Sequence, residues 1–305
     1  MVETSDEWII SRTGIQERRI AAKDECTSDL GVQAAKAALK AAKLKSEDID
    51  LILVATLTPD HIFPSTACLI QEKIKAKNAA AIDIQAACSG YLYGMAFAKA
   101  LVENKNYQNI LLIASEKLSS IVNYKDRSTC VLFGDGAAAA VISLKGKGGY
   151  EIQKVNLGSE GALGDLLKLP AGGSFLPATA ETVKNKQHYI QMSGNETFKH
   201  AVRRMEMASK ECLAALKMKE SQVDWLIPHQ ANLRIIEAIA KRFKHLPKEH
   251  VYKEGVVKYG NTSACSVGIA LDELEKSGRV RAKENLLFTA FGAGLTWGAA
   301  LITKK

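Results

Sequence analysis

Helical and strand-like patterns of apolar residues alternate along the whole chain, which indicates an α/β protein. Residues 38–52 read as an Ala/Leu/Lys helix, a short acidic turn, and an aspartate followed by an apolar strand. Residues 212–226 repeat this order, with Asp224 in the place of Asp50. The chain therefore matches itself at a long offset, which is the sign of an internal repeat.

Three further blocks match in the same order and at nearly the same offset. They pair 87–89 with 264–266, 109–115 with 284–290, and 133–143 with 291–303. Two α/β segments can look alike by composition alone, but four ordered matches favour a tandem duplication. We expect two halves, 1–147 and 148–305, each built from a helix, a strand, a small-residue helix, a strand, a glycine turn and a strand.

The small-residue helices indicate how the halves pack. Residues 86–98 carry Ala, Gly or Ser on nearly every side, which predicts a helix buried where backbones approach closely. Two sheets that enclose such helices give a five-layered α/β/α/β/α fold. The segment 158–190 is rich in Gly and Pro and has no partner in the repeat, so we expect it to cover a site or a partner surface.

Composition narrows the class of protein. The 305 residues include 41 Lys+Arg against 33 Asp+Glu, a net charge of +8, and the basic residues are scattered singly. This charge suits an anionic substrate or an acidic protein partner better than nucleic acid. The uncharged run 285–303 contains three glycines, so it predicts two strands around a turn rather than insertion into a membrane.

The ends and the cysteines add two expectations. The acidic start lacks the apolar core of a secretory signal. The six cysteines are dispersed, and none forms a CxxC pair, which argues against a disulfide scaffold and against a zinc site. We therefore expect a reduced, cytoplasmic enzyme.

Three polar residues stand at positions that the repeat brings together. Cys88 follows the apolar strand 79–84 and opens the first small-residue helix, where the helix dipole favours a thiolate. Asn261 precedes the second such helix, close to Cys265, the image of Cys88. His229 follows a strand of the second half, at the sheet edge where ligands bind in α/β folds. The three are expected to converge between the halves.

Each of these residues also has a plain structural explanation. A free cysteine is usually buried and inert, and a histidine at a strand end is usually held by structural hydrogen bonds. Asparagine favours turns and helix caps. The matching positions in the repeat favour the chemical interpretation of Cys88, His229 and Asn261.

Seven motifs make the chain resemble the thiolase superfamily and, within it, the β-ketoacyl-acyl-carrier-protein synthase III family of initiating condensing enzymes. They are TSDEWIISRTGIQERRIA (4–21), AACSGYLYG (86–94), FGDGAAAAV (133–141), SGNETFKHAV (193–202), PHQANLRII (228–236), YGNTSACSVGIALDE (259–273) and FGAGLTWGAAL (291–301). An asparagine as the third polar residue is what the resemblance implies for the initiating and chalcone-synthase-like branches, and the opening motif favours the former.

The resemblance implies a thiolase-like fold and an acyltransferase. An acyl group would pass from acetyl-CoA, or another short acyl-CoA, to Cys88 and then condense with malonyl-acyl carrier protein, with loss of CO2, to give a 3-oxoacyl-acyl carrier protein. The N–H groups of Cys88 and Ala293 would hold the oxyanion. His229 and Asn261 would donate hydrogen bonds to the enolate oxygen. The implied chemistry needs no metal and no redox cofactor.

The same resemblance implies binding surfaces. The implied CoA contacts are Thr4, Trp8, Arg12, Arg127, Asn195, Phe198 and Asn232. The implied docking surface for the acidic carrier protein is Gln230, Ala231, Asn232, Leu233 and Arg234. Phe63 matches a residue that reaches into the acyl pocket of a neighbouring subunit, which implies a homodimer. Ser128 stands where the family has Gly, so the adenine wall is expected to differ slightly.

Three other functions stay open at this point. A related synthase would use a longer or branched starter or make a specialised metabolite. A cysteine hydrolase would use Cys88 and His229 without a malonyl acceptor. A non-catalytic relative would only bind acyl groups or carrier protein.

The second half begins with a strand-like segment at Tyr150, and the repeat offers no counterpart for it in the first half. Members of the resembled family carry further residues ahead of the TSDEW motif. We therefore expect that the natural start lies upstream or that the chain is shortened. We also expect that the unmatched strand would lie inside the first sheet, where its absence leaves backbone groups unpaired.

Overall fold

Two four-stranded sheets form the frame of the protein in a computed structural model, which describes residues 2–146 and 148–305. The first sheet has the order β2-β1-β3-β4 and the second the order β5-β10-β9-β8. The strands of the first sheet are β1 (Leu51–Ala55), β2 (Ala80–Ile84), β3 (Asn109–Glu116) and β4 (Gly136–Ser143). The strands of the second sheet are β5 (Tyr150–Ser159), β8 (Trp225–Pro228), β9 (Asn285–Gly292) and β10 (Thr296–Lys304). A separate short pair joins β6 (Leu167–Lys168) to β7 (Gln191–Met192).

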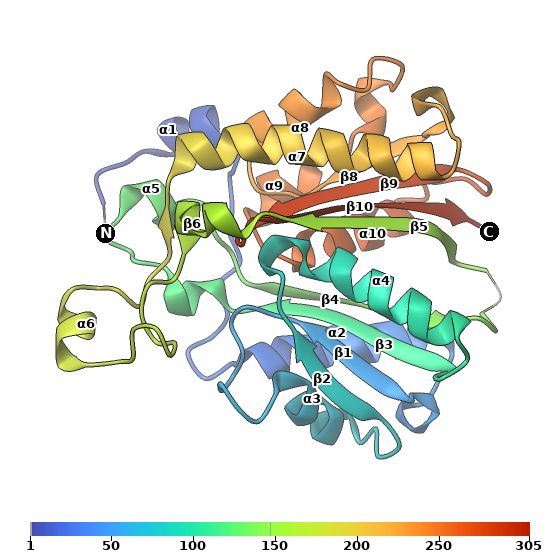
Figure 1. Cartoon of the computed structure of the whole chain (residues 1–305), viewed down its shortest axis with the longest axis horizontal. Helices are drawn as coiled ribbons and strands as arrows, with labels where there is room; N and C mark the ends of the chain where they lie inside the picture. The colour runs from blue at the N-terminus through green and yellow to red at the C-terminus, as the bar shows by residue number, and fades with distance from the viewer. Residues whose placement is uncertain (1, 147) are drawn as a thin grey trace.

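Helices fill three layers around the two sheets (Figure 1). The outer face of the first sheet is covered by α2 (Thr27–Ala42) and α3 (Thr66–Ile74). Between the sheets lie α4 (Gly90–Glu103) and α10 (Cys265–Lys276). The outer face of the second sheet is covered by α7 (Gly194–Ala215) and α8 (Leu233–Ala240). Shorter helices in the connections are α1 (Asp6–Thr13), α5 (Arg127–Cys130), α6 (Ala180–Lys184) and α9 (Glu254–Tyr259). The five-layered arrangement expected from the repeat is therefore present.

The two sheets repeat one hydrogen-bonding scheme. β1 runs parallel to β3 and β8 runs parallel to β9, while β4 and β10 run antiparallel to β3 and β9. Asp50 and Asp224 hold equivalent places ahead of β1 and β8. Their carboxylates accept hydrogen bonds from the backbone N–H groups of Asn109 and Asn285, at 2.9 and 2.7 Å. The two matching aspartates therefore each bond the start of the neighbouring strand in their own half.

Small residues allow the central helix α4 to approach the strands closely. A Cβ added at Gly90 would lie 3.1 Å from the Cβ of Ala55 in β1. A Cβ added at Gly94 would lie 2.3 Å from Cδ1 of Leu112 in β3. Leu92, between these glycines, is fully buried. The prediction that this helix is buried between the sheets is confirmed.

The opening strand of the second half lies at a sheet edge. β5 pairs antiparallel with β10 and has no strand on its other side in the described part of the chain. The equivalent place in the first sheet is the outer edge beside β4. The expectation that the unmatched strand would lie inside the sheet was wrong, because the strand order puts the first strand of a half next to its last one.

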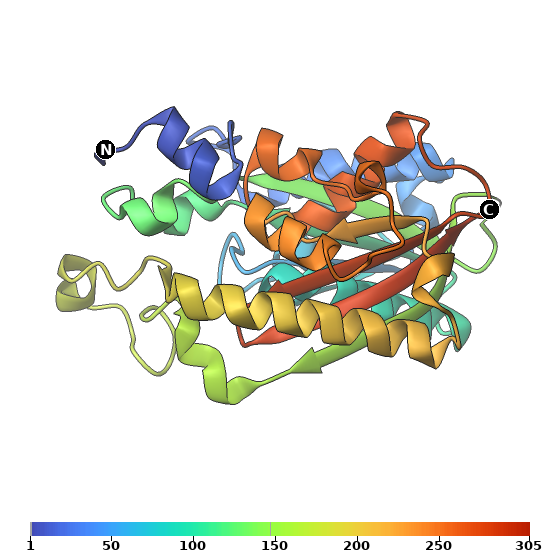
Figure 2. The same ribbon diagram turned by 90° about the horizontal axis from the view of Figure 1, so that it is seen from above.

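Two other expectations concern connecting segments. The uncharged run forms β9 and β10 around a turn, as predicted. Across residues 2–146 and 148–305, no helix combines the length and the apolar character that crossing a membrane requires. The segment that carries α6 projects from the body at the end where the N-terminus lies (Figures 1 and 2), and Phe175 in it is 96% exposed.

We predict that Gly94→Val lowers the free energy of unfolding by about 3 kcal/mol, because the added methyl groups press against Leu112 and Ile84. Urea unfolding at neutral pH measures this change. Gly161→Val is the matched control, since nothing lies within 4 Å of a Cβ added there. Equal losses of stability in the two variants would contradict the packing argument.

Candidate active site

A cavity of about 480 Å³ brings residues of both halves together. Cys88 lines it from the first half, and His229 and Asn261 line it from the second. The three polar residues that the repeat singled out therefore share one site. Among residues 2–146 and 148–305, no group of three or more His, Cys, Asp or Glu side chains is arranged to hold a metal ion.

Cys88 lies in a short 3-10 turn, Ala87–Ser89, that joins the end of β2 to α4. The end of β9 presses on this turn, because a Cβ added at Gly292 would lie 2.7 Å from the backbone nitrogen of Cys88. The Oγ1 hydroxyl of Thr296 donates to the carbonyl of Ala86 at 2.9 Å. Burial raises the pKa of the Cys88 thiol to about 12. The thiol thus keeps its proton at rest, whereas the helix dipole alone was expected to favour the thiolate.

His229 follows β8 directly and is buried, with 4% of its surface exposed. Its backbone N–H donates to the carbonyl of Thr289 at 2.8 Å, which continues the pairing of β8 with β9. Its Nδ1 lies 2.6 Å from Oγ of Ser266 in α10. That Oγ also accepts from the backbone N–H of Gln230 at 3.4 Å. Nδ1 is the acceptor within reach of the hydroxyl proton, so we assign the Ser266 hydroxyl as the donor to Nδ1. The neutral imidazole then carries its proton on Nε2.

Asn261 is held by backbone contacts to the first half. Its N–H donates to the carbonyl of Leu132 at 2.8 Å, and its carbonyl accepts from the N–H of Gly134 at 3.0 Å. Its side-chain Oδ1 accepts from the N–H of Ser263 at 2.9 Å. The amide oxygen is thereby occupied, and the NH2 group is the part of the side chain left to donate.

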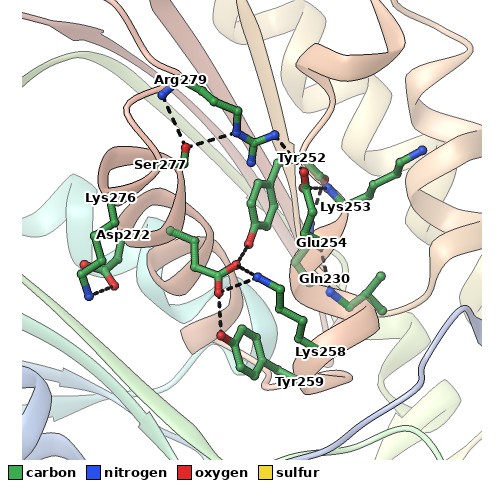
Figure 3. Close-up of polar contacts among 12 residues, drawn as sticks. Gln230, Tyr252, Lys253, Glu254, Lys258, Tyr259, Asp272, Lys276, Ser277 and Arg279 are labelled. Carbon is green, nitrogen blue, oxygen red and sulfur yellow. Dashed lines mark hydrogen bonds and ion pairs between the residues drawn. The ribbon is translucent and has the colours of Figure 1, made fainter.

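The helix that precedes Asn261 is fixed by the carboxylate of Glu273. Figure 3 shows the labelled side chains of Tyr252, Lys258 and Tyr259 converging on one carboxylate. This carboxylate accepts from the hydroxyls of Tyr252 and Tyr259 and from the ammonium of Lys258. Tyr259 and Lys258 belong to α9 and Glu273 to α10, so the network ties the two helices together. The turn that carries Asn261 starts from this anchored helix.

Most of the residues expected to contact CoA surround the same cavity. The lining includes Trp8, Arg12, Arg127, Asn195, Phe198 and Asn232. The guanidinium of Arg127 lies 4.9 Å from the centre of the Trp8 ring. A flat ring can enter between these two side chains only if Arg127 moves away. Thr4 is exposed and is not among the residues that line the cavity.

The expected docking residues divide into two groups. Ala231, Asn232 and Arg234 line the cavity, and the guanidinium of Arg234 donates to the carbonyl of Ser11 at 2.9 Å. Gln230 is 1% exposed, and its amide donates to the carbonyls of Pro228 and Tyr252.

Burial makes the side chain of Gln230 unsuitable for a docking surface. Its amide oxygen accepts from the N–H of Val256, so its polar atoms serve contacts inside the protein. The expectation for this residue was wrong. Leu233 is half-buried and packs against Gly14, where an added Cβ would lie 2.5 Å from the Cβ of Leu233. Its side chain therefore joins α8 to α1.

Two expected residues lie outside the lining of the cavity. Ala293 follows Gly292, which does line it, and the carbonyl of Ala293 accepts from Thr296. Phe63 is 84% exposed, in the loop between β1 and α3.

Several residues near the site were missed by the reasoning from sequence. Ser263 and Ser266 stand within the motif that carries Asn261, and their spacing to it was the available signal. Glu116 is fully buried at the end of β3, and no motif marks it. A buried carboxyl at a strand end beside the nucleophile is found only with the structure in hand.

Comparison with known proteins agrees with this geometry. Residues 82–161 match the model of the family described as 3-oxoacyl-(acyl-carrier-protein) synthase III, and residues 213–304 match the model of its C-terminal part. A β-ketoacyl-(acyl-carrier-protein) synthase III of Chlamydia muridarum is 55% identical over 302 residues, which cover 99% of this chain and 92% of the relative. The chain belongs to the 3-oxoacyl-acyl-carrier-protein synthase III family.

Solved structures of the family have the same fold. The 3-oxoacyl-(acyl-carrier-protein) synthase III of Aquifex aeolicus superimposes with a TM-score of 0.89 at 47% identity, over 99% of this chain and 92% of that one. The enzyme of Thermus thermophilus gives a TM-score of 0.89 at 41% identity, over 100% and 92%. The thiolase-like α/β fold and the class of condensing acyltransferase, both implied by the motifs, are confirmed for this family member.

We predict that the family member loses stability in acid through His229. Burial lowers the pKa of this histidine to about 4, against 6.5 for an ordinary histidine, so below pH 6.5 the unfolded chain binds a proton that the folded chain does not. The free energy of unfolding is highest above pH 6.5, and it falls by about 3 kcal/mol as the pH drops from 6.5 through 4. Urea unfolding across this range measures it.

The variant His229→Gln should flatten this pH dependence, because the residue no longer titrates. His61→Gln, at an exposed histidine, is the control and should keep the dependence of the parent. The same slope in all three proteins would show that another group is responsible.

Proposed function

We propose that this family member initiates fatty-acid synthesis by condensing acetyl-CoA, or another short acyl-CoA, with malonyl-acyl carrier protein. The observation that supports this most is the convergence of Cys88, His229 and Asn261 on one cavity that both halves build. A thiol, a neutral imidazole and an amide together supply the nucleophile and the two hydrogen-bond donors that a decarboxylative condensation through a cysteine thioester needs.

In the first step the sulfur of Cys88 attacks the thioester carbonyl of the acyl-CoA, and CoA leaves. A tetrahedral intermediate with a negative oxygen forms on the way. We assign its stabilisation to the backbone N–H groups of Cys88 and Ala293. The close approach of Gly292 to the Cys88 nitrogen supports this, because it brings the chain before Ala293 against the turn that holds the nucleophile.

In the second step malonyl loses CO2, and the resulting enolate attacks the acyl group on Cys88. The negative charge that grows on the thioester oxygen needs donors, and a carboxylate in their place would repel it. His229 supplies Nε2–H while Ser266 occupies its other nitrogen, and Asn261 supplies its NH2 while Ser263 occupies its oxygen. Both donors are oriented before the negative charge develops, so their hydrogen bonds stabilise the transition state more than the bound substrate.

CoA and the carrier protein would enter from the side of α1 and α8. The cations of Arg12 and Arg127 suit the phosphates of CoA, and Trp8 offers an aromatic face to its adenine. Thr4, which is exposed and close to Trp8 in the sequence, is proposed as a further contact. Asn195, Phe198 and Asn232 would line the path of the pantetheine arm. Exposed Arg234 with Ala231 and Asn232 would meet the acidic carrier protein, and the net charge of +8 favours its approach.

The remaining features of the proposal concern the assembly. Phe63 and its neighbour Ile62 are 84% and 85% exposed, which fits contact with a second subunit. We propose a homodimer in which Phe63 reaches the acyl pocket of the other copy. The proposal also includes a cytoplasmic location, two halves that divide near residue 147, and catalysis without a cofactor, since acyl transfer and decarboxylation need only the donors described above.

Cys88→Ser should lower the rate of condensation at least about 1,000-fold, because a serine hydroxyl is far harder to deprotonate than a thiol and is the poorer nucleophile toward a thioester. Intact-mass detection of the acyl-enzyme, together with product formation from acetyl-CoA and malonyl-acyl carrier protein, measures the loss. Cys26→Ser, at an exposed cysteine that caps α2, is the control and should stay active. Condensation at the parent rate in Cys88→Ser would refute the mechanism.

Arg234→Glu should raise the KM for malonyl-acyl carrier protein about 10-fold, because it puts a negative charge where an acidic partner docks. Acyl loading from acetyl-CoA should change much less. Lys77→Glu makes the same change of charge at an exposed lysine that does not line the cavity. Equal KM values for the two variants would remove Arg234 from the docking surface.

A further inference from the structure

A buried carboxyl group lies beside the nucleophile and takes no part in the mechanism above. Glu116, the last residue of β3, is fully buried. Its Oε2 accepts three hydrogen bonds, from Oγ1 of Thr58 at 2.7 Å, from the N–H of Leu57 at 3.1 Å and from Oγ1 of Thr56 at 3.2 Å. Its Oε1 is buried and has no hydrogen-bond partner among the described residues. One oxygen is thus fixed and the other is free to exchange a proton.

The turn that carries Ser263 packs beside the start of α4 and beside the turn bonded to Glu116. A Cβ added at Gly90, just after Cys88, would lie 3.4 Å from the Cβ of Ala264 and 3.1 Å from the Cβ of Ala55, which precedes the Thr56–Thr58 turn. The Ser263 hydroxyl is therefore in the neighbourhood of both groups. It is buried and, like Oε1 of Glu116, has no partner with full hydrogen-bond geometry in the described part of the chain. Burial raises the pKa of Cys88 and that of Glu116, and the Ser263 hydroxyl offsets part of this rise in both groups. Ser263 is held in place from its backbone, since its N–H donates to Oδ1 of Asn261 at 2.9 Å. Hydrogen bonds of this kind often tighten only when substrate is bound.

The proposed reaction needs a place for one proton. Cys88 rests as a thiol, so its proton must leave when the sulfur attacks the acyl-CoA. The thiolate released by the condensation must regain a proton before the next cycle. His229 is unsuited to hold this proton, because burial lowers its pKa to about 4 and its Nε2–H is needed as a donor.

We infer that Glu116 stores the proton of Cys88 during the catalytic cycle and exchanges it through the hydroxyl of Ser263. The inference rests on the proposed function. Glu116 acts on the sulfur of Cys88 only through Ser263, so it is a positioning residue and not a catalytic one.

During acyl loading the Cys88–acyl bond forms and the acyl–CoA bond breaks, the thiol proton passes through Ser263 to the Glu116 carboxylate, and the CoA thiolate takes a proton from water. During condensation the carbon–carbon bond forms as CO2 leaves, and the Cys88–acyl bond breaks. Glu116 then returns its proton through Ser263 to the Cys88 thiolate. Over one cycle a single proton is consumed from solvent and ends on CoA.

The surroundings of Glu116 suit a group that changes its charge. The titratable groups that face it are two thiols, Cys88 and Cys265. Lys117 points away, with its ammonium bonded to the carbonyls of Ala22 and Glu25. Burial raises the pKa of Glu116 to about 7, so the carboxyl changes its protonation in the physiological range.

The pH dependence of the two half-reactions follows from this. Loading needs Glu116 ionised, so its rate rises with pH through about 7. Condensation needs Glu116 protonated, so its rate falls with pH through about 7. Single-turnover measurements of acyl-enzyme formation, and of its consumption by malonyl-acyl carrier protein, separate the two rates.

Glu116→Gln should lower both rates about 10- to 100-fold and remove both pH dependences, since its amide keeps an acceptor for Thr58 but stores no proton. Ser263→Ala should do the same from the other end of the relay, and the double variant should be no slower than either single one. The control is Asp83→Asn. The carboxyl of Asp83 is partly buried, and both of its oxygens accept hydrogen bonds from backbone N–H groups, so this variant should keep both pH dependences.

Three outcomes are distinguishable. Loss of both pH dependences in Glu116→Gln and in Ser263→Ala supports the relay. Slower rates with unchanged pH dependence would show that Glu116 only holds the Thr56–Thr58 turn, and parent-like rates would show that it has no role, so either result overturns the inference. If the parent protein itself forms no acyl-enzyme, the proposed function fails instead.

Discussion

The close packing of α4 against α10 between the two sheets fixes the nucleophile relative to the serine that bonds His229. A Cβ added at Gly268 in α10 would lie 3.3 Å from Cε2 of Tyr91 in α4, and one added at Gly90 in α4 would lie 3.4 Å from the Cβ of Ala264, the residue before α10. Contacts at this distance leave no room for adjustment by flexible side chains. The starts of both helices are therefore fixed relative to each other, and Cys88 and Ser266 with them.

Burial then sets the chemistry of the groups that this packing brings together. Burial away from water keeps the Cys88 thiol protonated and His229 neutral. It also raises the pKa of Glu116 to about 7. A neutral imidazole is the useful form for a donor, while a protonated thiol is not the useful form of a nucleophile. The site thus gains preorganised donors at the cost of a nucleophile that must part with its proton in each cycle.

Reasoning from sequence located the reactive centre because the chain carries its own internal comparison. The repeat placed Asn261 beside the image of Cys88, and the structure puts both on one cavity. Reasoning from sequence failed where the environment of a residue depends on contacts with residues distant in the sequence. Gln230 looks like a surface residue next to His229, but Tyr252 and Val256 bury its amide. The edge position of β5 was likewise hidden, since a hydrophobic pattern does not reveal which strands are neighbours.

The backbone of Asn261 is bonded to Leu132 on one side and Gly134 on the other, so this amide depends on the contact between the halves rather than on either half alone. Heating or denaturant that loosens the contact would therefore displace the enolate donor while both sheets are still folded. Activity would be lost in a local opening, ahead of global unfolding. The working range of the protein would then be set by the contact between its halves.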